Sequence, residues 1–217
     1  MKKYDALTKS KITSGLQCHK KLWFDIHQPI IENKAAFKRG FRFEDEVRKI
    51  YAKSQKVLDL SPEKVRWIKP KERTEQAINS KDINVIFEGA FEYLNTLVRT
   101  DVLIRKKKGW ELLEVKSSTK KKPEHIKDIS IQSFIVKKCM KQLGHDLITI
   151  KLIHINKYFT LKKEGKYEGL IHDEIDITEE INEEEIPNYI KDLITFTKKD
   201  SPCPNIKMGS HCKKPYD

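Results

Sequence analysis

The sequence lacks a long apolar run, a secretory leader and an internal repeat. No apolar stretch approaches the roughly 20 residues that a membrane-spanning helix needs. The segment Met1–Ser14 carries lysines but no apolar core of a signal peptide. These absences predict a cytoplasmic protein with no membrane partner. Since no linker divides the chain, a single α/β domain is the simplest expectation.

Cysteine is scarce as well, with four in 217 residues. They are Cys18, Cys139, Cys203 and Cys212. In a reducing compartment, cysteines remain free thiols or bind metal rather than forming disulfides. The expected location therefore excludes a disulfide framework and leaves metal ligation open.

Acidic residues are outnumbered, with 32 Asp and Glu against 44 Lys and Arg, for a net charge of +12. Such an excess favours polyanionic partners, nucleic acid first and acidic membrane surfaces second. Genome composition also produces lysine-rich chains, so charge alone does not decide between these explanations. The apolar share of 38% is typical of a globular protein.

The spacing of apolar residues predicts a mixture of helices and strands. Helices are expected over Leu7–His27, Ala35–Ser54, a segment after Pro70, Pro123–Leu143 and Ile186–Lys198. Strands are expected at Lys56–Leu60, Asn84–Tyr93, Leu97–Arg105, Trp110–Lys116, Leu147–Ile155 and Leu170–Ile177. We expect one domain over residues 1–200 and an irregular tail with two cysteines over residues 201–217.

Two neighbouring strands carry the residues with the clearest chemistry. The polar run Lys106–Gly109 is typical of a hairpin loop between them. If the strands pair across this loop, opposed residue numbers sum to 215 and Asp101 faces Glu114. Strand alternation then puts Lys116 on the same face. Directly opposed Cβ atoms lie about 4.5–5.5 Å apart, so the two carboxylates can share one cation.

Close carboxylates repel each other unless a cation neutralises them. A hard ion such as Mg²⁺ or Mn²⁺ suits oxygen ligands beside a phosphate, which it polarises while activating water. Lys116 can orient that water or stabilise developing negative charge. Phosphodiester hydrolysis requires these features. The alternative is a salt-bridged cluster on a solvent-facing sheet, but the apolar neighbours favour an interior sheet, where unpaired charge is costly.

Four segments resemble the RecB-like branch of the PD-(D/E)XK nucleases. More closely, they resemble an uncharacterised bacterial family related to CRISPR-associated RecB-like exonucleases. The segments are LTKSKITSGLQCHKKLWFDIHQP, IFEGAFEYLNTLVRTDVL, WELLEVKSST and DISIQSF. The resemblance implies a restriction-endonuclease-like core, a central mixed sheet flanked by helices. It also implies that Asp101 and Glu114 bind metal, that Lys116 is catalytic and that Gln132 helps to position the site.

The resemblance further implies a Mg²⁺- or Mn²⁺-dependent deoxyribonuclease, including exonuclease action on single strands or DNA ends. DNA repair and defence against foreign DNA both fit such an enzyme. RecB-like proteins carry an additional metal-site acid one helical turn after a glycine. Glu44, four residues after Gly40, is the residue expected in that role. The alternative is that Glu44 belongs to a solvated helix face, and Glu88 matches a family position or is structural.

Several RecB-like relatives hold a [4Fe–4S] cluster with one early and three late cysteines. Cys18 and Cys212 match this pattern, but two further cysteines would be expected after Cys212 and this sequence ends at Asp217. Two thiolates cannot hold a cubane cluster, which needs four. Cys203 could substitute and Cys139 could join it, although Cys139 reads as a buried helix residue. A zinc site is the other alternative, with ligands Cys18, Cys203, His211 and Cys212.

Three basic runs could contact phosphates: Lys106–Lys108, Lys120–Lys122 and Lys137–Lys138. Trp110 and Phe134 could stack on unpaired bases or lie in the core. Two other functions remain open. One is a nucleic-acid-binding module that keeps the nuclease fold without cleaving. The other is a lysine-rich adaptor for RNA or ribosomes, which leaves Asp101, Glu114 and Lys116 unexplained.

Overall fold

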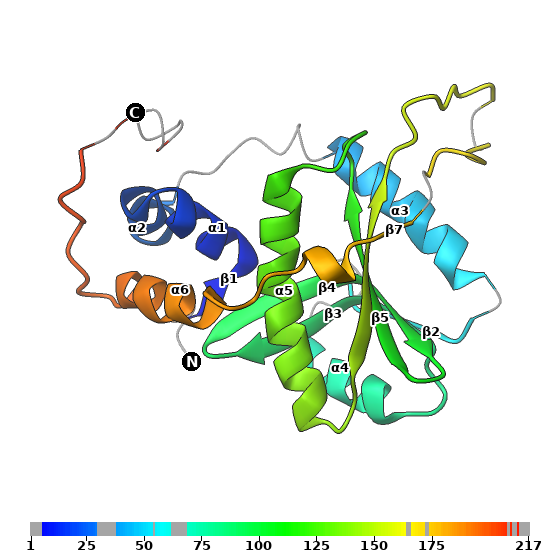
Figure 1. The fold of residues 1–217 in the computed structure, drawn as a ribbon, viewed down its shortest axis with the longest axis horizontal. Helices are drawn as coiled ribbons and strands as arrows, with labels where there is room; N and C mark the ends of the chain where they lie inside the picture. The colour runs from blue at the N-terminus through cyan, green and yellow to red at the C-terminus, as the bar shows by residue number, and fades with distance from the viewer. Residues whose placement is uncertain are drawn as a thin grey trace.

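The structure is a computed structural model that describes residues 6–29, 38–53, 55–61, 69–163, 166–171, 174–207, 209 and 212. A mixed sheet of seven strands lies at its centre, in the order β2-β3-β4-β5-β6-β7, with β1 pairing to β4 (Figure 1). The strands are β1 (Leu7–Thr8), β2 (Val57–Asp59), β3 (Val85–Tyr93), β4 (Thr96–Lys106), β5 (Gly109–Lys116), β6 (Leu147–His154) and β7 (Ile175–Asp176). The chain is therefore an α/β protein with a central mixed sheet flanked by helices, as the sequence predicts.

Helices cover both faces of this sheet (Figure 1). They are α1 (Lys9–Gln17), α2 (His19–His27), α3 (Lys38–Ala52), α4 (Pro70–Asn79), α5 (Pro123–Gln142) and α6 (Ile186–Leu193), with short 3₁₀ turns at Thr178–Glu180 and Ile194–Thr197. One apolar core joins the sheet to α5 and the helices beside it, and a second lies under α3 through Phe43 and Val47. Among the described residues, no helix is long and apolar enough to cross a membrane.

The antiparallel strands β3, β4 and β5 form the middle of the sheet, and α5 connects β5 to the parallel strand β6. Strand alternation and the proline at the start of α5 predict these elements to within about two residues. The β4–β5 turn is tighter than expected. Lys106 pairs with Gly109, which leaves Lys107 and Lys108 as the connecting residues.

The prediction of one helix over Leu7–His27 is wrong. Leu7 and Thr8 extend as β1 and pair with Thr96 and Leu97 at the start of β4. The Thr8 hydroxyl then caps α1, accepting from the Lys11 N–H at 3.3 Å. Cys18 is extended and separates α1 from α2, with its sulfur accepting from the backbone N–H of Lys21. Tertiary pairing thus overrides the local helical pattern.

One further expectation needs correction, and one open alternative is decided. The strand predicted over Leu170–Ile177 is reduced to Ile175–Asp176 and an isolated bridge between Ile155 and Ile171, while residues 172–173 lie outside the described part. Trp110 and Phe134 are 0% and 5% exposed, so both are core residues rather than stacking platforms for bases. Residues 201–207 have no regular secondary structure, as expected of the tail.

Arg105 joins the β4–β5 hairpin to α4. Its guanidinium lies over the ring of Trp110, 4.2 Å from the centroid, and its Nε donates to the carbonyl of Ile83. Its Nη2 donates to backbone carbonyls at and after the end of α4, those of Ala77, Ile78 and Ser80. These carbonyls would otherwise lack partners, as the last carbonyls of a helix do.

We predict that Arg105→Lys lowers the free energy of unfolding by about 1–3 kcal/mol, because a single ammonium cannot replace the planar fork and its stacking on Trp110. Urea denaturation measures the change. Arg73→Lys, on α4 itself, leaves the Arg105 contacts intact and is the matched control. Equal stabilities of the two variants would contradict this role for Arg105.

Candidate active site

Four elements direct polar side chains to one place between the sheet and α5. Strand β5 contributes Glu114 and Lys116 and strand β4 contributes Asp101. From the helices come Asp128 and Gln132 on α5 and Lys9 at the start of α1. Helix α5 lies over the middle of the sheet with α1 beside it (Figure 1). Three of the predicted catalytic residues therefore meet a fourth, Gln132, under one helix.

The β4–β5 register follows the predicted sum of 215 from Lys106–Gly109 to Val102–Leu113. The pairing ends there, one residue before Asp101 and Glu114, so their direct opposition stays a prediction. Just beyond the paired residues, the Val115 N–H donates to Asp101 Oδ2 at 2.7 Å, where a regular ladder would use a backbone carbonyl as the acceptor. Strands β4 and β5 thus bring two carboxyl groups within electrostatic reach of each other.

Glu114 is 2% exposed. Its Oε1 accepts from the Nζ atoms of Lys9, at 2.9 Å, and Lys116, at 2.7 Å. Burial opposes ionisation, but the charges and hydrogen bonds of Lys9 and Lys116 outweigh it and lower the pKa of Glu114 to about 2. Its Oε2 is buried and has no hydrogen-bond partner within the described part of the chain.

Asp101 is shifted in the opposite direction. Burial, followed by the negative charge of Glu114, raises its pKa well above the usual range. The opposing effects of Lys9 and the Val115 N–H are smaller. Adjacent carboxyl groups with pKa values pushed apart are typical of functional sites, where one group is ionised and the other is held towards its neutral form.

Lys116 is held between the sheet and α5. Its Nζ donates to Asp128 Oδ2 at 2.6 Å as well as to Glu114. Burial opposes its charged form, but Glu114 and Asp128 raise its pKa, so the ammonium persists. Gln132, one helical turn after Asp128 and 0% exposed, accepts from Lys9 at 3.1 Å and donates to the Arg99 carbonyl at 2.7 Å. Gln132 thus links α5, α1 and β4.

Glu44 does not join this group directly. Its Oε2 lies 4.0 Å from Arg48 Nη2, and its side chain is 30% exposed. Burial and the charge of Glu88 raise its pKa, with a smaller effect from Glu114. Glu44 is therefore within electrostatic reach of the site. No group of three or more His, Cys, Asp or Glu side chains is arranged to hold a metal among the described residues, so its role as a third ligand stays a prediction.

Glu88 has a φ of +56°, in the left-handed region, which is uncommon for a residue with a side chain. Pairing with β4 includes Phe87–Val102 and Gly89–Thr100 on either side of it. Its carboxylate accepts from Arg48 at 2.7 Å. Such local strain costs about 1–3 kcal/mol and clusters at functional sites. In this structure Glu88 anchors Arg48, the ion-pair partner of Glu44.

The sequence did not point to Lys9, Asp128, His125 or His154. Asp128 and His125 were open to prediction from helical spacing, since Gln132 follows Asp128 by four residues and His125 precedes it by three. His154 is the β6 register partner of Lys116, and its ring centroid is 5.6 Å from that of His125. Burial, followed by the charge of Lys116, lowers the pKa of His125.

Cys18 and Cys212 are brought together, with Sγ atoms 2.8 Å apart and both side chains buried. Burial and the hydrogen bond to Cys212 raise the pKa of Cys18. Cys203 is exposed and Cys139 donates to the Glu92 carbonyl from within α5. The iron–sulfur cluster and its zinc alternative stay predictions, and His211 lies outside the described residues.

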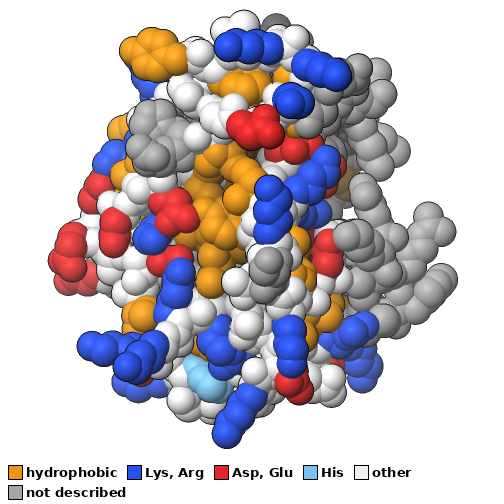
Figure 2. Space-filling model, turned by 90° about the vertical axis from the view of Figure 1, so that its right-hand side faces the viewer, with side chains coloured by type: hydrophobic (Ala, Val, Ile, Leu, Met, Phe, Trp, Pro, Cys, Tyr) orange, Lys and Arg blue, Asp and Glu red, His pale blue; other side chains and the backbone are white. Residues whose placement is uncertain are grey.

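The basic runs are not equally close to the site. Lys106–Lys108 lies at the opposite end of β5 from Lys116, roughly 20 Å away at about 3.3 Å per strand residue. Lys120–Lys122 directly precedes α5 at the site end. Lys121 pairs with Glu180 and Lys137 with Glu183. Figure 2, viewed from the α3 side, shows basic side chains spread around an apolar surface rather than gathered in one patch.

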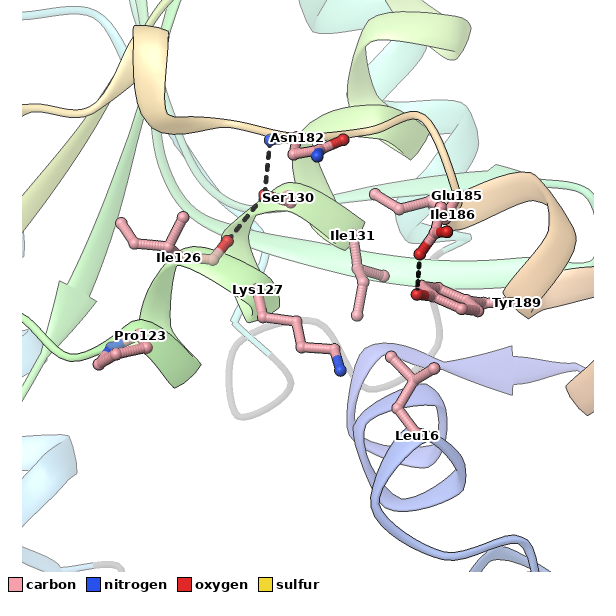
Figure 3. Close-up of a pocket in the computed structure, with 10 residues that line it drawn as sticks. All are labelled: Leu16, Pro123, Ile126, Lys127, Ser130, Ile131, Asn182, Glu185, Ile186 and Tyr189. Carbon is pink, nitrogen blue, oxygen red and sulfur yellow. Dashed lines mark hydrogen bonds between the residues drawn. The ribbon is translucent and has the colours of Figure 1, made fainter.

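A hollow of about 280 Å³ lies beside the site, between α1, α5 and α6. Its lining includes Leu16, Ile126 and Ile131 (Figure 3). The Ser130 hydroxyl at its wall is already bonded to the Ile126 carbonyl and the Asn182 N–H. The charged residues of the candidate site do not line this hollow: Lys9, Asp101, Glu114, Lys116 and Asp128 are all absent from its lining.

No family model matches this chain, and neither does any curated protein. The solved structure of a protein designated SSO0001 is similar, with a TM-score of 0.40 and 14% sequence identity. The match covers 92% of this chain and 80% of that one. A likeness at this level carries no functional argument.

Proposed function

We propose that the chain is a metal-dependent nuclease of the PD-(D/E)XK type that hydrolyses DNA phosphodiester bonds. The observation that carries the proposal is the meeting of Asp101, Glu114 and Lys116 at one largely buried place between the sheet and α5, where Glu114 is 2% and Lys116 20% exposed. Ionisable groups are costly in such a position, so a structural surface ion pair is a poor explanation.

The donor chemistry of the site fits Mg²⁺ or Mn²⁺. Asp101 and Glu114 provide hard oxygen donors, which these ions prefer. The buried Glu114 Oε2 has no hydrogen-bond partner in the described structure, and burial, followed by the negative charge of Glu114, raises the pKa of Asp101. Asp101 and Glu114 would hold the ion, with Glu44 proposed as the third acid. Such an ion, when bound, polarises the phosphate and activates water.

The remaining residues bind and orient. The Lys116 ammonium, directed by Asp128 at 2.6 Å, can donate to a phosphate oxygen on which negative charge develops. Gln132 fixes the distance between α5 and β4 through its bond to the Arg99 carbonyl. The net charge of +12 and the Lys120–Lys122 segment at the site end favour a polyanionic substrate. DNA, and exonuclease action on single strands or ends, follow from the resemblance.

A catalytically silent nucleic-acid-binding module is the second candidate. One observation favours it: the Lys9 ammonium already satisfies Glu114 Oε1, at 2.9 Å, as a structural partner would. A silent site that had become an ion-pair network would have this appearance. The intact Asp101, Glu114 and Lys116 favour the enzyme.

A cleavage assay decides between these candidates. Labelled single-stranded, linear double-stranded and circular DNA are incubated with Mn²⁺, Mg²⁺ or EDTA. We expect metal-dependent cleavage that Asp101→Ala reduces by at least about 10²-fold, the loss typical of removing one key electrostatic group. An exonuclease spares the circle. Binding without cleavage by the wild type would support the silent module, and undiminished cleavage by Asp101→Ala would overturn the site assignment.

A further inference from the structure

Lys9 reaches the candidate active site from a part of the chain more than a hundred residues away in sequence from Glu114. It is the first residue of α1. The preceding strand, β1, is paired with β4. Its Nζ donates to Glu114 Oε1 at 2.9 Å and to Gln132 Oε1 at 3.1 Å. It also lies 3.4 Å from Asp128 Oδ2, and only 22% of its side chain is exposed.

We infer that Lys9 is the resident counter-ion of this site and competes with a divalent cation for Glu114. The inference rests on the proposed function, because it assumes that Asp101 and Glu114 hold a metal. It adds a residue that the resemblance does not place in the site. It also assigns a function to the first helix, which brings that residue to the sheet.

The charges in the site support this role. Three carboxyl groups, Asp101, Glu114 and Asp128, meet two ammonium groups, those of Lys9 and Lys116. Without Lys9, the buried Glu114 would keep a single lysine partner. A divalent ion between Asp101 and Glu114 would lie close to the Lys9 ammonium, and like charges at such distances repel strongly away from bulk water. The two cations therefore cannot share Glu114 freely.

Of the two lysines, Lys9 is the one that can release Glu114 to a divalent cation. Lys116 belongs to β5, two residues after Glu114, and its 2.6 Å bond to Asp128 is its shortest. Lys9 belongs to a separate helix and retains other acceptors when it leaves Glu114: Gln132 is already bonded and Asp128 is 3.4 Å away. A change of side-chain rotamer is enough to release Glu114, with β1 and β4 remaining paired.

The inference is tested by measuring Mn²⁺ affinity without nucleic acid, by calorimetry or electron paramagnetic resonance. Lys9→Met keeps the length of the side chain and removes its charge, so we expect it to bind Mn²⁺ at least about 10-fold more tightly than the wild type. Lys9→Arg keeps the charge and should stay within about threefold of the wild type. Lys127→Met removes an exposed charge from α5 as the matched control and should change the affinity by less than about threefold.

Thermal unfolding provides a second readout that tolerates a less stable variant. Tighter binding to the folded state stabilises it more at a given metal concentration, so Mn²⁺ should raise the melting temperature of Lys9→Met more than that of the wild type. Equal or weaker Mn²⁺ binding by Lys9→Met overturns the inference while leaving the metal site standing. If neither protein binds Mn²⁺, the proposed metal site fails and the inference fails with it.

Discussion

Replacing Lys116 by methionine is expected to lower the rate of metal-dependent DNA cleavage by about 10²–10³-fold while Mn²⁺ still binds. Methionine fills nearly the same volume but cannot donate a hydrogen bond. In the structure the Lys116 ammonium bonds both Glu114 and Asp128 and is only 20% exposed, so its charge acts in a partly dehydrated environment. There a donor aimed at a phosphate oxygen is worth far more than on the surface.

Metal binding and the chemical step of cleavage must be measured separately. Single-turnover cleavage at saturating enzyme reports the chemical step, and Mn²⁺ titration reports the metal site. Lys191→Met, an exposed lysine on α6, is the matched control and should cleave at the wild-type rate. A Lys116→Met rate within about threefold of the wild type would remove Lys116 from the catalytic group.

The part of the site predicted from sequence is the part built by local pairing. Asp101 and Glu114 lie on adjacent strands joined by a tight turn, so alternation and loop length were enough to predict the register of these strands up to the pair Val102–Leu113, next to the two acids. The same reasoning placed Lys116 beside Glu114. Short-range geometry determines this hairpin, and no knowledge of the rest of the fold was required.

The part not predicted depends on contacts between distant segments. The bond from Lys9 to Glu114 spans 105 residues, and that from Lys9 to Gln132 spans 123. Nothing in the local pattern of α1 singles out Lys9 from the other lysines around it. The extended conformations of Leu7, Thr8 and Cys18, which set where α1 begins and ends, arise from pairing with β4 and from capping.

The burial of aromatic residues likewise could not be predicted from the local sequence. Trp110 sits beside a lysine-rich turn, which suggested a nucleic-acid contact, yet it is 0% exposed because it lies in the main apolar core with the Arg105 guanidinium over its ring. Strand alternation predicts on which face of the sheet a side chain lies. Whether that side chain is buried depends on segments from elsewhere in the chain that pack against this face. Glu88 is a further case, since its left-handed φ follows from no local signal such as glycine or asparagine.

Glu114→Ala is expected to destabilise the metal-free protein, whereas Asp101→Asn is expected to leave it as stable or make it more stable. Removing Glu114 leaves Lys9 and Lys116 partly buried with Asp128 as their remaining ion-pair partner, at a cost of about 3 kcal/mol, the lower end for breaking a buried pair. For a domain of this size, that loss lowers the melting temperature by roughly 6–12 °C. Glu114→Gln, which keeps the shape and an acceptor, should lie between Glu114→Ala and the wild type.

The pH dependence of stability distinguishes the two acids further. Because the folded pKa of Glu114 is lowered from 4.5 to about 2, its contribution is complete above pH 4.5 and is lost as the pH falls towards 2. The folded pKa of Asp101 is raised above 3.8, so the wild type loses stability relative to Asp101→Asn as the pH rises above about 4. Thermal unfolding of the metal-free protein between pH 2 and 8 measures both. If Asp101→Asn proved as unstable as Glu114→Ala, the negative charge of Asp101 would be stabilising the fold beside Lys9, and the description of Asp101 as a ligand held ready for a cation would be wrong.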